Sequence, residues 1–373
     1  MNFNIINRTK LIGVFTAVVM FAGFTLPSFA DTQLLTYQDA IQIALKNNRN
    51  LTKISDQLDK LDEQYSTPTG APPYILLIKP GLSAQLTQRS QKLSNASQTV
   101  KLQFEAVADG LELQIKASFY KVNLLKDSID MKNKKLLDAE DKHRILSLKY
   151  RNGMASKFEV EQSEIALSEL KEGIKAEQIS LEKEIQNLKS ILGVTVFNYN
   201  ELEELPIEYS LVDDLHLKPE YQAAKAVSDS PSIMAQKKSI EEAELAVVLT
   251  PLSIASAGTD VGITPVNVQK SDIKLKDTEL RNAKDELYFT IVSTYNNIKT
   301  LETNISQMEV QLENLNNNID AMQVRLKAGV VSQRDLDNLL IMKEELLVGI
   351  KSLKANHTMM LMQYQKPHLL GLS

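Results

Sequence analysis

The sequence between residues 291 and 326 reads IVSTYNNIKTLETNISQMEVQLENLNNNIDAMQVRL. Mostly apolar residues recur in it at alternating steps of three and four residues, and we call these positions the seam. This spacing is the heptad period of a coiled coil, in which long helices wind left-handedly around their neighbours. The stretch therefore predicts one very long helix that packs lengthwise against others. The seam positions are Ile291, Thr294, Ile298, Leu301, Ile305, Met308, Leu312, Leu315, Ile319, Met322 and Leu326.

The same heptad spacing occurs earlier in the chain. Residues 104–153 superimpose on residues 280–329 without a gap, at a constant offset of 176 residues. Each seam position of the later stretch has a counterpart in the earlier stretch at this same offset. We therefore interpret the chain as a duplication with two very long helices. The seam positions of the first copy are Ile115, Ser118, Val122, Leu125, Ile129, Lys132, Leu136, Ala139, His143, Leu146 and Tyr150.

Each long helix is predicted to end in a tight reversal. Gly153 and Gly329 supply the left-handed backbone that closes a helix, and Ser156 and Ser332 follow as N-caps of a returning helix. Three residues after each cap stands an acid, which favours a capping box. These acids are Glu159 and Asp335. The returning helices are predicted at residues 157–192 and 333–363.

Composition narrows the class of protein. The 42 Lys and Arg residues against 47 Asp and Glu residues give a net charge of −5, which argues against a dedicated nucleic-acid binder. The chain has no cysteine, which excludes disulfides, thiolate metal sites and a lipid-modified N-terminal cysteine. The four histidines are scattered and no phosphate-binding glycine loop occurs, so we expect no enzyme activity, no cofactor and no metal site.

The N-terminus reads as a secretory signal. Arg8 and Lys10 precede an apolar run at residues 11–26, and Ser28-Phe29-Ala30 form a small-x-small cleavage site. The apolar run of about 16 residues is shorter than the roughly 20 that span a bilayer, although an uncleaved anchor is the alternative. The sequence thus predicts an exported protein.

These signals divide the chain into four parts. Residues 1–30 are the signal peptide, residues 31–193 the first helical repeat, residues 194–218 a linker, and residues 219–373 the second helical repeat. Each repeat opens with a shorter amphipathic helix, at residues 36–66 in the first and from about residue 221 in the second. The expected fold class is all-α, with duplicated long antiparallel coiled-coil helices.

Three motifs together resemble the TolC family of outer-membrane efflux proteins. They are LTYQDAI at residues 35–41, the reversal YRNGMASKFEV at residues 150–160, and the closing Leu192-Gly193. The resemblance implies a homotrimer whose long helices form an α-barrel tube, the tips of which dock a periplasmic adaptor joined to an inner-membrane transporter. It implies an outer-membrane or periplasmic location, and efflux in a tripartite exporter.

The resemblance also assigns roles at the helix tips. The adaptor-docking turns are Gly153, Met154, Ser156, Gly329, Val330 and Ser332, and the entrance constriction is formed by Tyr150, Glu159, Asp335 and Asp337. From the residues alone, these three acids read equally well as solvated acids in the first turn of a helix. Tyr150 likewise reads as a seam residue. Leu326 stands where the family usually has a second tyrosine.

The chain departs from the family pattern in the gaps before each long helix. A membrane hairpin needs two strands of about 9 to 11 residues with aromatic girdles. The gaps at residues 67–88 and 251–269 are short and interrupted by proline, so we expect the transmembrane strands to be vestigial or missing. The protein would then serve an envelope without an outer membrane, or associate with a membrane only through these short segments. The alternative function is a non-conducting extracytoplasmic coiled-coil scaffold or spacer.

Overall fold

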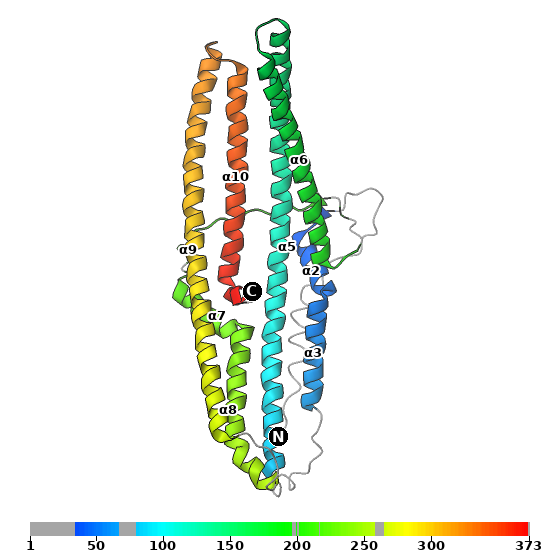
Figure 1. Cartoon of the computed structure of the whole chain (residues 1–373), viewed down its shortest axis with the longest axis vertical. Helices are drawn as coiled ribbons and strands as arrows, with labels where there is room; N and C mark the ends of the chain where they lie inside the picture. Colours follow the sequence, from blue (N-terminus) through cyan, green and yellow to red (C-terminus); the bar gives the residue numbers. More distant parts are fainter. Residues whose placement is uncertain are drawn as a thin grey trace.

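Two pairs of long antiparallel helices lie side by side along a rod in the computed structural model (Figure 1). The structure describes residues 34–66, 80–195, 199, 201–215, 217–257 and 265–371. The first pair is α5 (Pro80–Arg151) with α6 (Lys157–Leu192), and the second is α9 (Val266–Lys327) with α10 (Gln333–Gln365). At 1.5 Å per residue, the 72 residues of α5 span about 110 Å and the 62 residues of α9 about 93 Å. The predicted all-α, duplicated architecture is confirmed.

The opening helix of each repeat is broken into two, which the sequence did not predict. In the first repeat the helices are α2 (Tyr37–Asn47) and α3 (Arg49–Ser66), and in the second α7 (Pro219–Asp229) and α8 (Pro231–Ala257). The Asn48 side chain accepts a hydrogen bond from the Leu51 N–H at 3.0 Å, and the Ser230 hydroxyl accepts one from the Ile233 N–H at 3.3 Å. Each polar side chain therefore starts a new helix at the break.

The long helices begin earlier than predicted. Residues 80–88, which we assigned to the first gap, belong to α5, and residues 251–257 and 266–269 of the second gap belong to α8 and α9. Pro80 is tolerated because the first residue of a helix needs no hydrogen-bonded N–H. The rest of both gaps, residues 67–79 and 258–264, lies outside the described residues, as does the predicted signal peptide.

Each repeat has its own hydrophobic core near the middle of the rod. In the first repeat, Phe119 of α5 packs with Leu188 and Leu192 of α6. In the second, Ile298 of α9 packs with Tyr364 of α10. Nearer the tips most seam side chains are only partly buried, so each helix pair covers only part of its apolar surface there.

A segment between the repeats crosses the rod at mid-height (Figure 1). We call residues 201–217 the belt; residue 216 is outside the described residues. Its first two residues form β2 (Glu201–Leu202), which pairs in parallel with β1 (Leu34–Leu35). The Asn123 amide of α5 donates to the Glu203 carbonyl at 3.3 Å, and the Tyr120 hydroxyl donates to the Pro206 carbonyl at 3.2 Å. The first half of the belt is thus tied to the first repeat.

The last element that the structure describes is a short 3-10 helix, η1 (Pro367–Gly371), which packs against α7 and also reaches α5 of the first repeat. Just before it, the Lys366 ammonium lies 2.7 Å from the Asp109 carboxylate and 2.8 Å from the Glu112 carboxylate of α5. The end of the second repeat is therefore fastened to the long helix of the first.

Candidate functional site

The two helix reversals lie at the same end of the rod (Figure 1). Below them, α5 and α10 are joined by a hydrogen bond of 2.9 Å from the Lys142 ammonium to the Asn338 amide oxygen. The Arg334 guanidinium lies 3.9 Å from the Asp138 carboxylate at the same level. The fold thus brings residues 150–159 and 326–337, which the resemblance assigned to docking and entrance, to one pole of the molecule.

The first reversal is a Schellman motif closed by Gly153. The Gly153 N–H donates to the Tyr150 carbonyl at 2.9 Å, and the Met154 N–H donates to the Lys149 carbonyl at 2.8 Å. Gly153 has a φ of 72°, the left-handed conformation that side chains disfavour. A Cβ at this position would meet no atom within 4 Å, so backbone conformation alone requires the glycine.

The second reversal repeats this geometry. The Gly329 N–H donates to the Leu326 carbonyl at 2.9 Å, the Val330 N–H donates to the Arg325 carbonyl at 3.0 Å, and Gly329 also has a φ of 72°. Both returning helices then start with a capping box, in which the serine hydroxyl accepts from the N3 backbone and the N3 acid accepts from the serine N–H. Ser156 and Ser332 therefore build the turns.

Apolar side chains project from both turns. Met154 is 68% exposed and Val330 is 72% exposed, and Phe158 and Val324 beside them are also largely exposed. An apolar surface at the end of a charged rod is typical of a contact site for another protein.

The predicted entrance residues are present at the tips, but two of the acids serve their own helices. Hydrogen bonds from the Ser156 backbone and hydroxyl lower the pKa of Glu159, and those from the Ser332 hydroxyl and backbone lower the pKa of Asp335. Both stay charged at neutral pH. Asp337 accepts a hydrogen bond of 2.8 Å from the Gln333 amide, and Tyr150 is half-exposed.

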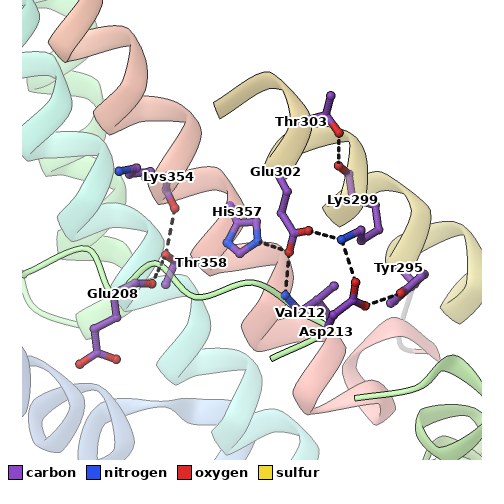
Figure 2. Close-up of polar contacts among 10 residues, drawn as sticks. All are labelled: Glu208, Val212, Asp213, Tyr295, Lys299, Glu302, Thr303, Lys354, His357 and Thr358. Atoms are coloured by element: carbon purple, nitrogen blue, oxygen red, sulfur yellow. Dashed lines mark hydrogen bonds and ion pairs between the residues drawn. The ribbon is translucent and has the colours of Figure 1, made fainter. Parts of the chain in front are cut away.

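A buried polar cluster at mid-height was missed by sequence reasoning (Figure 2). Glu302 of α9 is only 5% exposed, and its Oε1 accepts a hydrogen bond of 2.7 Å from the Val212 N–H of the belt. Its other oxygen lies 2.7 Å from the Lys299 ammonium, and His357 Nε2 of α10 lies 3.3 Å from Oε1. Burial alone would raise the pKa of Glu302, but the hydrogen bonds from Lys299, Val212 and His357 lower it below its ordinary value.

Further contacts fasten the second half of the belt around this cluster. The Asp213 carboxylate accepts hydrogen bonds from the Tyr295 hydroxyl at 2.7 Å and the Lys299 ammonium at 3.0 Å. The Thr358 hydroxyl donates to the Glu208 carbonyl at 2.9 Å, as Figure 2 shows. The belt is thus held by α9 and α10 through side chains that all meet near Glu302.

One signal in the sequence could have found Glu302. It follows Ile298 by four residues and precedes Ile305 by three, so it fits the seam as well as Leu301 does. The structure buries Glu302 and leaves Leu301 only partly covered. Glu302 is therefore buried more deeply than the seam residue Leu301, because the belt supplies partners that make a buried carboxylate favourable.

Within the described ranges, no group of three or more histidine, aspartate or glutamate side chains is arranged to hold a metal ion. In the same part of the chain, no helix is long and apolar enough to cross a membrane.

The fold is similar to that of solved outer-membrane channels. The open-state MtrE outer membrane channel of Neisseria gonorrhoeae superimposes with a TM-score of 0.63 at 12% identity, covering 93% of each chain. The CmeC outer membrane channel of Campylobacter jejuni gives 0.61 at 11% identity, covering 94% of this chain and 93% of that one. CusC, whose structures describe transmembrane channel formation, gives 0.61 at 11% identity over 92% and 95%.

A scan against protein-family models found no match, and a search among curated proteins found none. The likeness therefore rests on three-dimensional structure, and the solved neighbours named above include channels. The chain has the fold of a TolC-like outer-membrane channel protomer, and the resemblance drawn from its sequence motifs is confirmed at the level of the fold.

Proposed function

We propose that this chain is the protomer of an exported, homotrimeric TolC-like conduit that passes cargo from an inner-membrane transporter and its periplasmic adaptor through a helical tube. The observation that carries the proposal is the pair of matching helix reversals at one end of a rod with a channel-protomer fold. Its location would be the outer membrane and periplasm, or the wall space of a cell without an outer membrane.

The contact between the repeats supports assembly into a ring. Within the chain, α5 of the first repeat meets α10 of the second through two ion pairs in the tip half of the rod. Lys134 pairs with Glu344 at 2.8 Å, and Lys135 pairs with Glu345 at 2.7 Å. Because the chain is a duplication, α9 and α6 carry the corresponding faces, shifted by 176 residues.

Those corresponding faces are exposed in the protomer. Val310 of α9, which corresponds to Lys134, is 54% exposed, and Gln311 beside it is exposed. On α6, Ser168 and Glu169 correspond to Glu344 and Glu345, and both are exposed. If the second repeat of one copy meets the first repeat of the next copy as α5 meets α10 within the chain, α9 of one copy packs against α6 of the next. Such a head-to-tail contact closes into a ring if the rotation between copies permits. That the ring contains three protomers is inferred from the family resemblance.

Cysteine cross-linking tests this assembly cleanly, because the chain contains no cysteine of its own. A full chain carrying Val310→Cys together with Ser168→Cys should form disulfides between copies upon oxidation. Denaturing gels without reductant should then show dimers and trimers, and a closed trimer as the largest product.

The matched control is the equivalent pair inside one protomer, Lys134→Cys with Glu344→Cys. It should cross-link within the chain and leave the mass of a monomer. Products that stay monomeric for the Val310 and Ser168 pair, or that extend far beyond trimers, would contradict the ring.

Docking at the tips has its own test. A photo-reactive residue introduced at Met154 or Val330 should capture an adaptor protein in cells of the source organism, since both side chains project from the turns. The control position is Leu137, which is 65% exposed on α5 but lies away from the tip. Equal capture from all three positions would argue against a docking role for the turns.

Conductance measurements distinguish the proposed conduit from the alternative function, a non-conducting scaffold, that the sequence also allows. Reconstituted into planar bilayers, a conduit should give discrete large conductance steps, whereas persistent silence of a cross-linkable trimer would favour the non-conducting spacer.

A further inference from the structure

A fully buried histidine lies where the belt meets the second repeat (Figure 2). His357 of α10 is 0% exposed, its Nε2 is 3.3 Å from the Glu302 carboxylate, and its Nδ1 is buried without a hydrogen-bond partner. The ring of Tyr209, a belt residue, packs against the imidazole edge-on, with centroids 4.9 Å apart. A neutral imidazole with its proton on Nε2 fits this environment, because it donates to the carboxylate and leaves no buried N–H unpaired.

The charged groups around His357 favour this neutral form. From α9 come Glu302 and Lys299, which already pair with each other, and Glu309, which pairs with Lys354 of α10 at 2.6 Å. The Lys354 ammonium lies 5.0 Å from the centroid of the Tyr209 ring. The belt adds Asp213, whose partners are Lys299 and Tyr295, and Glu208. On α5, the Tyr120 hydroxyl is bonded to the belt and Asp127 is paired with Lys351 of α10.

Among the described residues, Glu302 is the only carboxylate within hydrogen-bonding distance of the imidazole; Lys299 neutralises it, and Lys354 is a second lysine nearby. A proton on Nδ1 would create a second N–H in a buried place that offers it no acceptor.

We propose that protonation of His357 releases the second half of the belt, residues 208–215, from α9 and α10. The first half stays bound to the first repeat, because the β1–β2 pairing and the hydrogen bonds from Asn123 and Tyr120 involve no titrating histidine. Release removes part of the connection between the two helix pairs at mid-height, while the pairing of Lys351 of α10 with Glu204 remains, so acid loosens one repeat against the other. This inference does not depend on the conduit function.

The direction of the pH dependence follows from burial. Burial lowers the pKa of His357, and the Glu302 carboxylate offsets this only in part. In the released state the imidazole meets water and regains an ordinary pKa of about 6.5. Release therefore takes up a proton, and the attached state loses stability as the pH falls below about 6.5, by up to about tenfold in the equilibrium constant per pH unit.

Amide hydrogen exchange on the full chain tests the release. The Val212 N–H donates to Glu302 in the second half of the belt, whereas the Glu203 N–H donates to the Leu35 carbonyl in the first half. Between about pH 7.5 and pH 5.5, a window around the ordinary histidine pKa, protection of Val212 corrected for intrinsic exchange should fall by up to about tenfold. Protection of Glu203 should not change.

Two variants assign the effect to this histidine. His357→Gln keeps a donor for Glu302 and cannot titrate, so Val212 protection should become independent of pH. His143→Gln is the matched control, since His143 contacts Ser163 in the tip half of the rod, and it should keep the wild-type profile.

Three results would overturn the proposal: a flat Val212 profile in the wild type, equal loss at Val212 and Glu203, or an unchanged profile in His357→Gln. If His357→Gln does not fold, the first two results, both read from the wild-type protein, still decide.

Discussion

In the part of the chain that the structure describes, each repeat buries one glutamate at mid-height, and the two glutamates have different partners. Glu184 of α6 lies 2.7 Å from the Lys121 ammonium and accepts hydrogen bonds from Ser118 at 2.9 Å and Asn187 at 3.0 Å. All of these partners are helix residues of the first repeat. Glu302 also has a lysine, but its remaining partners are a backbone N–H of the belt and a buried histidine.

Neither glutamate has a counterpart at the 176-residue offset, where Glu184 corresponds to Met360 and Glu302 to Lys126. The duplication has therefore kept the lengthwise apolar seam, while each repeat has acquired a polar centre of its own. The first centre joins two helices of one repeat. The second holds the belt, which connects the repeats. A buried carboxylate thus stabilises helix packing in the first repeat and the attachment of the belt in the second.

The comparison is tested most strongly by removing each carboxylate. Glu302→Ala should lower the free energy of unfolding by about 3–5 kcal/mol, the usual cost of breaking a buried ion pair. It leaves the Val212 N–H without its acceptor and removes the nearer of the two carboxylates that pair with Lys299. Glu184→Ala should cost less, about 1–3 kcal/mol, because the side chain of Lys121 is 64% exposed and remains hydrated. Denaturant unfolding of both variants measures the difference.

Glu302→Gln sharpens this test, since an amide can still accept from Val212 while it removes the charge. The expected loss in the free energy of unfolding is smaller than that of Glu302→Ala but not zero. Equal losses for Glu302→Ala and Glu184→Ala would mean that the belt contributes nothing to the second centre.

The tips should show the opposite behaviour, because their geometries match. Gly153→Ala and Gly329→Ala should each cost about 1–2 kcal/mol, the price of a side chain in the left-handed conformation. Both sites have open space around a Cβ, so no clash adds to this cost. Exchange of the Met154 and Val330 amides, which close the two turns, reports the local loss. Asparagine at either position should cost less than alanine, and clearly unequal losses at the two tips would break the symmetry.

Much of the fold could be predicted because its determinants are local. The glycine, the serine cap and the acid three residues later lie within seven residues of one another, and α6 begins and ends where the sequence placed it, at Lys157 and Leu192. The second return helix was predicted to end at residue 363 and ends two residues later, at Gln365, because the buried Tyr364 continues its apolar face.

The rest depended on contacts between residues far apart in sequence. The partners of Glu302 lie 90 and 55 residues away, at Val212 and His357, and no spacing rule connects them. The four histidines looked scattered because the fold, and not the sequence, brings His357 to Glu302 and His368 to Asp109. The breaks at Asn48 and Ser230 were missed because polar side chains within an amphipathic pattern read equally well as an exposed helix face.

A smaller effect distinguishes the serine caps from the histidine cluster. Ser156→Ala and Ser332→Ala should each weaken their helix by about 1 kcal/mol. The pKa values of Glu159 and Asp335 are lowered in the folded state, so these acids contribute stability above their ordinary pKa of about 4, which is lost as the pH falls through the lower folded values. Carbon chemical shifts of residues 157–160 and 333–336 should therefore show fraying only below about pH 4. Fraying near pH 6 would link the tips to His357.

The smallest effects are expected where α5 meets α10. Lys134→Ala and Lys135→Ala remove ion pairs with exposed or half-exposed partners, and each should cost less than about 1 kcal/mol, decreasing with added salt. Lys351→Ala should cost more, since this half-buried lysine joins Asp127 of α5 at 2.6 Å and Glu204 of the belt at 2.7 Å. Unfolding at low and high salt measures both. If all three variants lose the same stability, the pairing of Lys351 with Glu204 of the belt adds nothing to the contact between repeats.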